Sequence, residues 1–367
     1  MDILTSFENK PLLFSRPKEI ISCYKPDLLP EAFKVMESFL RQGYYLAGFV
    51  SYEAGHGFED KLRDKAAYDF PLIYMGCYDA PCPGQDFIPE AKKDFALRQI
   101  QPNINFPDYR TDIQRIRSYI QSGDVYQITY CLKMKFSFQG DARSLYHTLL
   151  EEQPVPYPAY LETKDFKILS LSPEMFMKKR GAFITTKPMK GTWPRGKTKL
   201  TDTFAGLRLK YDQKNRAENV MIADLLRNDL GRIGSNVKAP KLFEVARYTT
   251  LYQMTSTVTA TIDEQVPLRD LFRALFPSGS VTGAPKMRAM QIIRELEDEE
   301  RKIYTGAIGY ITPGRDLFFN IPIRTILLRA NEGEMGIGGG IVWDSTPDGE
   351  WDEGMLKARF LTDHEQV

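Results

Sequence analysis

Stretches rich in β-branched and aromatic residues recur along the chain, and several follow one another with no helix between them. The clearest, residues 125–138 (VYQITYCLKMKFSF), alternates in hydrophobicity and predicts a strand. Further strands are expected at residues 44–55, 71–80, 166–171, 248–262, 303–312, 316–329 and 334–343. Strands grouped with strands, with helices arriving intermittently, indicate an α+β fold with antiparallel sheets.

Helices are expected at residues 31–43, 109–123, 212–230 and 285–300. The first two end in Gly43 and Gly123, a residue type that commonly stops a helix. Between the first two helices, residues 81–108 are rich in proline and polar residues. We predict that this segment is a linker that separates an N-terminal part from the rest.

Composition excludes several classes of function. The 49 Lys and Arg residues against 48 Asp and Glu residues leave a net charge of +1, which favours neither nucleic acid nor an anionic membrane as a partner. No apolar run reaches 18 residues, and the first residues do not resemble a signal peptide. Four scattered cysteines without a CxxC pair favour free thiols, so a cytoplasmic location is expected.

Only three histidines occur, so acid–base chemistry is expected from carboxylates and lysines. Residues 169–196 place Glu174 beside a proline and Lys190 in a Pro-Met-Lys-Gly-Thr turn. A solvated loop is the alternative for this segment. In the helix expected at 212–230, Glu218 shares a face with Ile222 and Asp229, and a carboxylate on such a stripe must be paired, protonated or bound to metal.

Two further segments offer sites for anions. Gly279, Ser280, Thr282 and Gly283 lead into a helix expected to begin at Pro285, whose free backbone amides suit a carboxylate or phosphate. Within the strand expected at 316–329, an arginine surrounded by apolar residues more often meets a carboxylate than water. That arginine is Arg324.

The C-terminal residues combine glycines with charges. Residues 338–340 are three consecutive glycines, which let the backbone approach a ligand closely. In a following helix, Glu350, Glu353 and Lys357 would share one face, although a Glu353–Lys357 surface pair is the simpler alternative. Oxygen ligands from Glu218 and Glu353 suit a hard cation such as Mg²⁺.

Seven segments together carry a resemblance: SPEMF, KPMKGTWPRG, RAENVMIADLLRNDLGR, SGSVTGAPKMRAM, YTGAIGY, IPIRTI and GGGIVWDSTPDGEWDE. In this order they resemble the motif series of the chorismate-utilising enzymes. The resemblance implies two mostly antiparallel sheets packed as a sandwich with surrounding helices. It also implies one large domain over 1–367, with an N-terminal part at 1–107 and a chorismate-binding catalytic core at 108–363.

Two positions separate the members of this family. Members that add water to chorismate carry a lysine base where this chain has Gln127, and an amide cannot take a proton from water. Anthranilate-forming members carry alanine where this chain has Lys190. The resemblance therefore implies amination at C4, with Lys190 as the nucleophile at C2 and Glu174 as general acid and base.

Other roles are also carried over from the family. Mg²⁺ is expected on Glu218 and Glu353 with Glu350 in support, and ammonia is expected from a partner glutaminase. A lowered pKa of Lys190 is expected from Mg²⁺, from desolvation, and from Lys187 or Arg195. Substrate-binding roles are implied for Gln127, Thr192, Ser280, Thr282, Gly283, Tyr304, Arg324, Gly338, Gly339, Gly340 and Lys357.

The chain departs from the family at two positions and leaves three alternatives. Asn215 stands where an acidic residue is common, and Gln253 where several members carry histidine. We also find no LLES-like segment of the kind that binds tryptophan in feedback-inhibited members. The alternatives are an anthranilate-forming enzyme, a non-catalytic chorismate-binding paralogue, and a nicotinamide-dependent oxidoreductase, which would need a GxGxxG unit that is absent.

Overall fold

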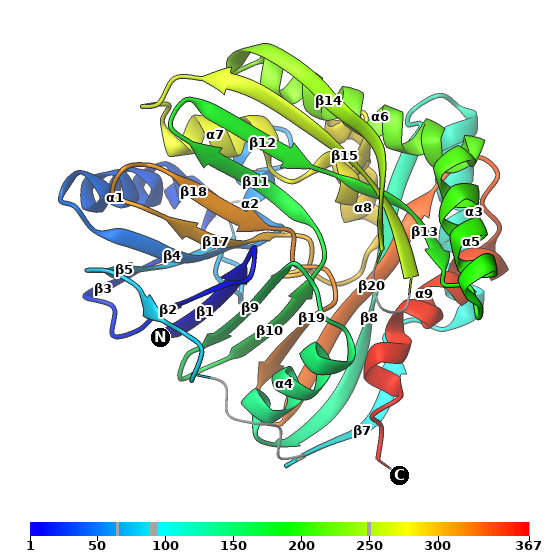
Figure 1. Ribbon diagram of the computed structural model, residues 1–367, viewed down its shortest axis with the longest axis horizontal. Helices are drawn as coiled ribbons and strands as arrows, with labels where there is room; N and C mark the ends of the chain where they lie inside the picture. The colour runs from blue at the N-terminus through cyan, green and yellow to red at the C-terminus, as the bar shows by residue number, and fades with distance from the viewer. Residues whose placement is uncertain (64–65, 88–93, 248–250, 367) are drawn as a thin grey trace.

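The chain folds into two ten-stranded sheets with helices around them (Figure 1). This computed structural model describes residues 1–63, 66–87, 94–247 and 251–366. Neighbouring strands of both sheets pair antiparallel. The four cysteines are free thiols. Within the described residues, no helix has both the length and the hydrophobicity to cross a membrane.

The first sheet contains the strand expected at 125–138, which is paired along one side with the glycine-rich strand near the C-terminus. The strand expected at 125–138 is β8 (Gln127–Gly140), and β7 (Phe95–Pro102) also pairs with it. Apart from β7, the strands of this sheet lie in the order β16 (Gly283–Ala284), β8 (Gln127–Gly140), β20 (Glu332–Ile341), β19 (Thr325–Arg329), β10 (Lys167–Ser172), β9 (Tyr157–Glu162), β1 (Asp2–Phe7), β2 (Lys10–Phe14) and β6 (Cys82–Pro83).

The second sheet combines strands from the N-terminal part with strands from the middle of the chain. A long strand, β14 (Gly234–Arg247), pairs with β15 beside this path. The order is β13 (Met189–Pro194), β15 (Leu251–Ile262), β12 (Phe183–Lys187), β11 (Met175–Arg180), β18 (Leu317–Asn320), β17 (Ala307–Ile311), β4 (Tyr45–Val50), β5 (Ile73–Tyr78) and β3 (Glu19–Cys23).

Three apolar clusters define the layers. Ile3 and Leu161 of the first sheet pack with Phe49 and Ile308 of the second, so the sheets face each other. Helices α1 (Leu29–Arg41), α6 (Gln213–Gly231) and α7 (Leu268–Leu275) pack on the second sheet. On the first sheet lie α3 (Phe106–Gln121), α4 (Ala142–Glu152), α8 (Lys286–Leu296) and α9 (Pro347–Thr362). The remaining α-helices of the described residues are α2 (Ala54–Phe58) and α5 (Lys199–Tyr211). The predicted α+β sandwich is confirmed.

The expected helices all form, with small differences at their ends. Gly43 and Gly123 follow α1 and α3 with φ values of 90° and 79°, as a helix stop requires. The helix α3 begins earlier than expected, because the Asn105 side chain accepts a hydrogen bond from the Asp108 amide at 3.0 Å and caps it. Pro285 is the N-cap residue of α8 rather than its first residue.

The linker expected at 81–108 is wrong in its second half. Within it, β7 (Phe95–Pro102) pairs with β8, and the first turn of α3 follows. The register of this pair shifts between Arg98 and Gln101, which breaks the alternation that would have marked a strand. Residues 88–93 of the expected linker lie outside the described residues.

The single strand expected at 316–329 is two strands in different sheets. β18 belongs to the second sheet and β19 to the first, so the chain crosses the sandwich between them. Pro322 and Arg324 lie in the crossing, and Arg324 has a φ of 50°, which interrupts a strand. The expectation that Arg324 lies inside a strand is therefore wrong.

Other strand predictions need smaller changes. The strand expected at 303–312 begins only at Ala307, which leaves Tyr304 in the preceding turn. The strand expected at 44–55 ends at Val50, and α2 follows it. Residues 248–250 of the strand expected at 248–262 lie outside the described residues. The strand β14 was not predicted, because three register shifts against β15 remove its alternation.

Candidate active site

Glu174 lies buried in the short connection between β10 and β11, with 3% of its surface exposed. Its Oε1 atom accepts hydrogen bonds from the Ser280 hydroxyl at 2.7 Å and from the Met189 amide at 3.3 Å. Burial raises the pKa of Glu174 to about 7, although both hydrogen bonds and the charge of Lys190 oppose that rise. A carboxyl group with this pKa can both give and take a proton near neutral pH.

Lys190 follows Met189 in β13 and is half-buried. Desolvation lowers the pKa of its ammonium group, and the charge of Lys357 adds to this, while Glu218 and Glu174 act in the opposite direction. A lowered pKa increases the fraction of neutral amine, the form that can act as a nucleophile. Lys190 must lose its proton before it can attack the substrate, and its lowered pKa favours that loss.

Lys187 and Arg195, the expected contributors to that shift, lie in other interactions. The Lys187 ammonium is 4.0 Å from Glu244, and the Arg195 guanidinium donates to both oxygens of Asp202, at 2.6 and 2.7 Å. Neither is among the causes of the lowered pKa of Lys190. Lys357, on the distant helix α9, takes their place, so this part of the prediction is wrong.

The glycines of β20 lie between two groups of side chains. A Cβ atom added to Gly340 would lie 2.3 Å from Gln127 Nε2 and 3.0 Å from Lys190 Nζ. A Cβ atom added to Gly339 would lie 3.1 Å from Glu350 Oε2 and 3.7 Å from Glu353 Oε1. Successive residues of a strand point to opposite sides, so the strand passes between the two groups and brings both within a few ångströms.

Gln127 presents a buried amide without a protein partner. Its side chain is fully buried in β8, and neither Oε1 nor Nε2 has a hydrogen bond within the described part of the chain. Gln253, at the position of the family histidine, is 4% exposed, and its Oε1 is likewise unsatisfied there. Because buried polar groups are almost always hydrogen-bonded, the Gln127 amide facing Lys190 marks a place for a polar ligand.

Three glutamates face the C-terminal half of β20. Glu218 lies on α6, and burial raises its pKa, with the charge of Glu353 adding to that rise. Burial also raises the pKa of Glu350, against a 2.6 Å hydrogen bond from Ser345. Burial acts in the same direction on Glu353, but Lys357 outweighs it and lowers the pKa.

Lys357 ties this group to the strand. Its Nζ atom lies 2.7 Å from Glu353 Oε1 and donates to the Gly338 carbonyl, also at 2.7 Å. The Glu353–Lys357 pair expected as the simpler alternative is therefore present, yet it faces the glycine strand. It is an ion pair at the site rather than one on a remote surface.

The donor chemistry here fits a hard divalent cation. The charge of Glu353 raises the pKa of Glu218, and a bound cation would relieve this repulsion between the two carboxylates. Over the described ranges, no group of three or more His, Cys, Asp or Glu side chains is arranged to enclose a metal. Mg²⁺ usually keeps several waters and takes only one or two protein carboxylates, so an open arrangement is consistent with it.

The segment before α8 also reaches this site. Ser280 bonds to Glu174, whereas the Thr282 hydroxyl donates to the Ser278 carbonyl at 2.9 Å. Gly283 has a φ of 150°, and a Cβ atom on it would lie 2.2 Å from the Gln127 carbonyl oxygen. Thr192, next to Lys190 in β13, is exposed, and it is paired in register with Gln253.

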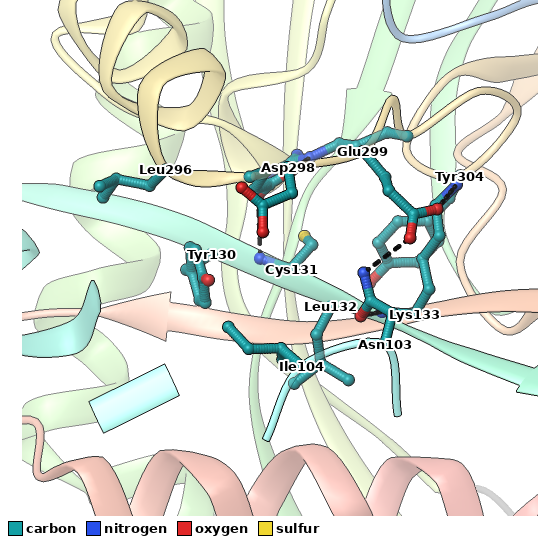
Figure 2. Close-up of a pocket in the computed structure, with 12 residues that line it drawn as sticks. Asn103, Ile104, Tyr130, Cys131, Leu132, Lys133, Leu296, Asp298, Glu299 and Tyr304 are labelled. Atoms are coloured by element: carbon teal, nitrogen blue, oxygen red, sulfur yellow. Dashed lines mark hydrogen bonds and ion pairs between the residues drawn. The ribbon is translucent and has the colours of Figure 1, made fainter. Parts of the chain in front are cut away.

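Tyr304 lies in the turn before β17, and Arg324 lies in the crossing between the sheets. The Tyr304 ring lies where a side chain on Gly336 would be, at 2.2 Å from its Cβ position. Tyr304 and Cys131 also line a hollow on the outer side of β8 (Figure 2). Glu174 and Lys190 are not among the residues that line this hollow. Arg324 is half-buried, and its backbone carbonyl accepts from the Leu171 amide at 3.0 Å.

Arg301 holds these segments together and was not predicted. Only 3% exposed, it donates to the carbonyls of Thr129 at 2.7 Å and Val281 at 2.8 Å, and to both carboxylate oxygens of Glu297. Thr129 lies two residues after Gln127, and Val281 lies between Ser280 and Thr282. The i, i+4 spacing of Glu297 and Arg301 was the one signal in the sequence, but it is also typical of exposed helical pairs.

The comparisons with known proteins identify the family of the chain. The family model described as chorismate binding enzyme matches residues 81–363. Aminodeoxychorismate synthase component 1 of Bacillus subtilis is 40% identical over 248 residues, which cover 67% of this chain and 53% of that protein. The protein of the same name from Escherichia coli is 38% identical, over 73% of this chain and 60% of its own length. Anthranilate synthase component 1 of Aquifex aeolicus is 35% identical, over 76% and 57%.

Solved structures share the fold at low identity. Anthranilate synthase component I from Streptococcus pneumoniae superposes with a TM-score of 0.79 at 22% identity, covering 98% of this chain and 89% of that one. The menaquinone-specific isochorismate synthase of Escherichia coli also gives 0.79, at 16% identity, with coverages of 100% and 88%. At these identities the match establishes the fold alone.

An α+β sandwich with a lysine, a buried glutamate and a carboxylate group around a glycine strand defines an enzyme site rather than a simple binding surface. The chain belongs to the family of chorismate binding enzymes. Several of its relatives are the first component of aminodeoxychorismate synthase, as the motif resemblance implied. The chain spans about half the length of these curated relatives.

Proposed function

We propose that this enzyme aminates chorismate at C4 with ammonia and produces 4-amino-4-deoxychorismate, the precursor of 4-aminobenzoate for folate synthesis. The observation that carries the proposal is the position of Lys190, whose amine has a lowered pKa and lies beside the unsatisfied Gln127 amide. Relatives named aminodeoxychorismate synthase component 1 support it. The catalytic core would comprise residues 108–363.

The first chemical step forms a bond between Lys190 Nζ and C2 of chorismate. The two ring double bonds shift along the path C2–C1–C6–C5–C4, the C4–O bond breaks, and the oxygen leaves as water with a proton from Glu174. The pKa of about 7 leaves this carboxyl partly protonated at neutral pH, and Ser280 holds the Oε1 atom in place. The alkylated Lys190 stays protonated as an ammonium, so it can leave as a neutral amine in the next step.

In the second step ammonia attacks C4, the double bonds shift back, and the C2–N bond to Lys190 breaks. The Glu174 carboxylate formed in the first step accepts the proton that the incoming ammonia loses. Gln127 cannot act as a base toward water, so hydration at C2 does not compete. Tyr304, Arg324, Thr192, Thr282 and the β20 glycines would orient the substrate.

Glu218 and Glu353, with Glu350 in support, would hold Mg²⁺ against a substrate carboxylate, and the ion would supply charge neutralisation there. Lys357 keeps Glu353 ionised, because it lowers the pKa of that carboxyl below the ordinary value. The ammonia would come from a separate glutaminase subunit. The words "component 1" in the names of the relatives imply that those proteins have a second component.

The second candidate is anthranilate formation, which the relative from Aquifex aeolicus favours. In that reaction ammonia adds at C2, and pyruvate is later eliminated. If the Lys190 amine is bonded to C2, ammonia cannot add at C2 and anthranilate is not formed. The two functions therefore differ in whether Lys190 is bonded to the substrate.

A covalent adduct tests the choice. Chorismate and Mg²⁺ without ammonia should leave a mass increase on the peptide that contains Lys190, and a Lys190→Ala variant should show none. With ammonium added, the product should be aminodeoxychorismate without release of pyruvate. Anthranilate as the main product, or an adduct on another residue, would refute the proposal.

A further inference from the structure

The helix α5, at the outer edge of the molecule in Figure 1, is apolar on two opposite faces. One face is buried: Ala205 and Leu209 pack with Tyr252 and Met254 of β15. The other face is exposed to solvent. It carries four large apolar side chains with exposed fractions of 46–68%, namely Leu200, Phe204, Leu207 and Tyr211.

These four residues form one continuous stripe. Their spacing of i, i+4, i+7 and i+11 places them within about 60° around a helix of 3.6 residues per turn. A helix on the surface of a globular protein normally carries polar residues on its outer face, and one that is apolar all round is normally covered. We call the four residues the α5 stripe.

The exposed charges of α5 itself have one sign. Lys199 and Lys210 lie along one side of the helix, Arg208 lies along the other, and all three are exposed. The only carboxylate between residues 197 and 211 is Asp202, which is 7% exposed and bonded to Arg195 on the inner side. The stripe is therefore an apolar surface with a basic border.

The position of α5 links it to the reaction. It connects β13, which carries Lys190, to α6, which carries Glu218. The Arg195–Asp202 ion pair fixes α5 to the end of β13, and the Tyr252 hydroxyl donates to the same carboxylate at 2.9 Å. A protein bound on α5 would therefore contact the segment that connects the strand of Lys190 to the helix of Glu218.

We propose that the α5 stripe is the docking surface for the subunit that supplies ammonia, an inference that rests on the proposed function. The partner surface would be apolar with acidic residues around it, so that opposite charges meet at the border. A second copy of this chain fits less well. A symmetric contact would place the basic border of one α5 against the basic border of the other.

The test uses the full chain with a purified glutaminase subunit of an aminodeoxychorismate synthase. Phe204→Ser and Tyr211→Ser remove large apolar groups from the α5 stripe. Phe183→Ser is the matched control, because Phe183 lies on β12 away from α5 and is 69% exposed, against 62% for Phe204. Three quantities are measured: the dissociation constant for the subunit, the glutamine-dependent rate, and the ammonium-dependent rate.

Both stripe variants should raise the dissociation constant at least about tenfold, as loss of an aromatic anchor does, and lower the glutamine-dependent rate at limiting partner. Their ammonium-dependent rate should stay within about twofold of the wild type, and Phe183→Ser should leave all three quantities unchanged. Unchanged binding in both stripe variants would overturn the inference. So would a wild-type dimer in sedimentation that Phe204→Ser converts to a monomer.

Failure of the docking inference is distinguishable from failure of the proposed function. If the wild type makes no aminodeoxychorismate from chorismate and ammonium, the function is wrong whatever the variants show. If that product forms but the subunit binds the stripe variants as tightly as the wild type, only the docking surface is wrong.

Discussion

Replacing Arg301 with lysine tests whether the geometry of the site depends on a residue that does not contact the substrate. Lysine keeps the positive charge for Glu297 but has three donors in place of the five N–H groups of arginine. The carbonyls of Thr129 and Val281 would then lose their donors while remaining buried. Each such loss costs about 1–3 kcal/mol, so the free energy of unfolding should fall by about 2–6 kcal/mol.

The effect on catalysis should exceed the effect on folding. The two carbonyls belong to the segments that carry Gln127, Ser280 and Thr282, and a shift of about 1 Å in such groups can lower a rate about 100-fold. We therefore expect kcat/KM of Arg301→Lys to fall about 10- to 100-fold per folded molecule, mostly through kcat. Steady-state kinetics with ammonium, corrected for the folded fraction by urea unfolding, measures this.

Arg315→Lys is the matched control. Arg315 also forms a buried ion pair, with Glu37 at 2.5 Å, and donates to the Val266 carbonyl at 2.6 Å, but it lies in the turn between β17 and β18. This variant should lose comparable stability and keep its kcat/KM. Equal kcat/KM losses in the two variants, or none in Arg301→Lys, would refute the bracing role.

Further outcomes are expected for variants of the site and for added ligands. Glu174→Gln should lower kcat about 10²- to 10⁴-fold. Because its pKa is raised from 4.5 to about 7, the native state holds a proton that the unfolded state releases in that range. Stability should therefore fall as pH rises from about 4.5 to 7, and Glu174→Gln should flatten this slope in urea unfolding. Glu218→Gln or Glu353→Gln should abolish activity and the increase in melting temperature with added Mg²⁺. Gly340→Ala should displace Gln127 and Lys190 and lower activity at least about tenfold, while Gly314→Ala, in open surroundings, should not. Millimolar tryptophan should leave the rate unchanged, and glutamine without a partner should give no product.

Periodicity predicted the elements whose environment is uniform along their length. The helix α6 shows this, because Ile222 and Leu226 face the core throughout and Asp229 is paired with Lys286 at 2.6 Å. The prediction failed where a chain changes sheet. Residues 317–329 are apolar on both sides of Arg324, so nothing in their hydrophobicity reveals that one half belongs to each sheet.

The residues of the site could be named from motifs, but their electrostatics could not. The pKa of Lys190 depends on Lys357, which is 167 residues further along the chain and reaches the site only because α9 packs on β20. The nearby Lys187 and Arg195 were expected to act because they are close in sequence. Lys187, at the end of β12, and Arg195, just after β13, instead form ion pairs with Glu244 and Asp202.

The glycines of β20 explain why the two halves of the site meet on one strand. Gly336, Gly338 and Gly340 share a face, and a Cβ atom on each would meet a different neighbour: the Tyr304 ring at 2.2 Å, the Tyr130 carbonyl oxygen at 2.2 Å, and Gln127 Nε2 at 2.3 Å. A side chain at Gly338 would force the backbones of β8 and β20 apart, since the obstacle there is a main-chain atom. At Gly340 the obstacles are the ends of two side chains, which can move. Gly338 therefore keeps the sheet closed, whereas Gly340 keeps open the space in which Lys190 and Gln127 can meet a substrate.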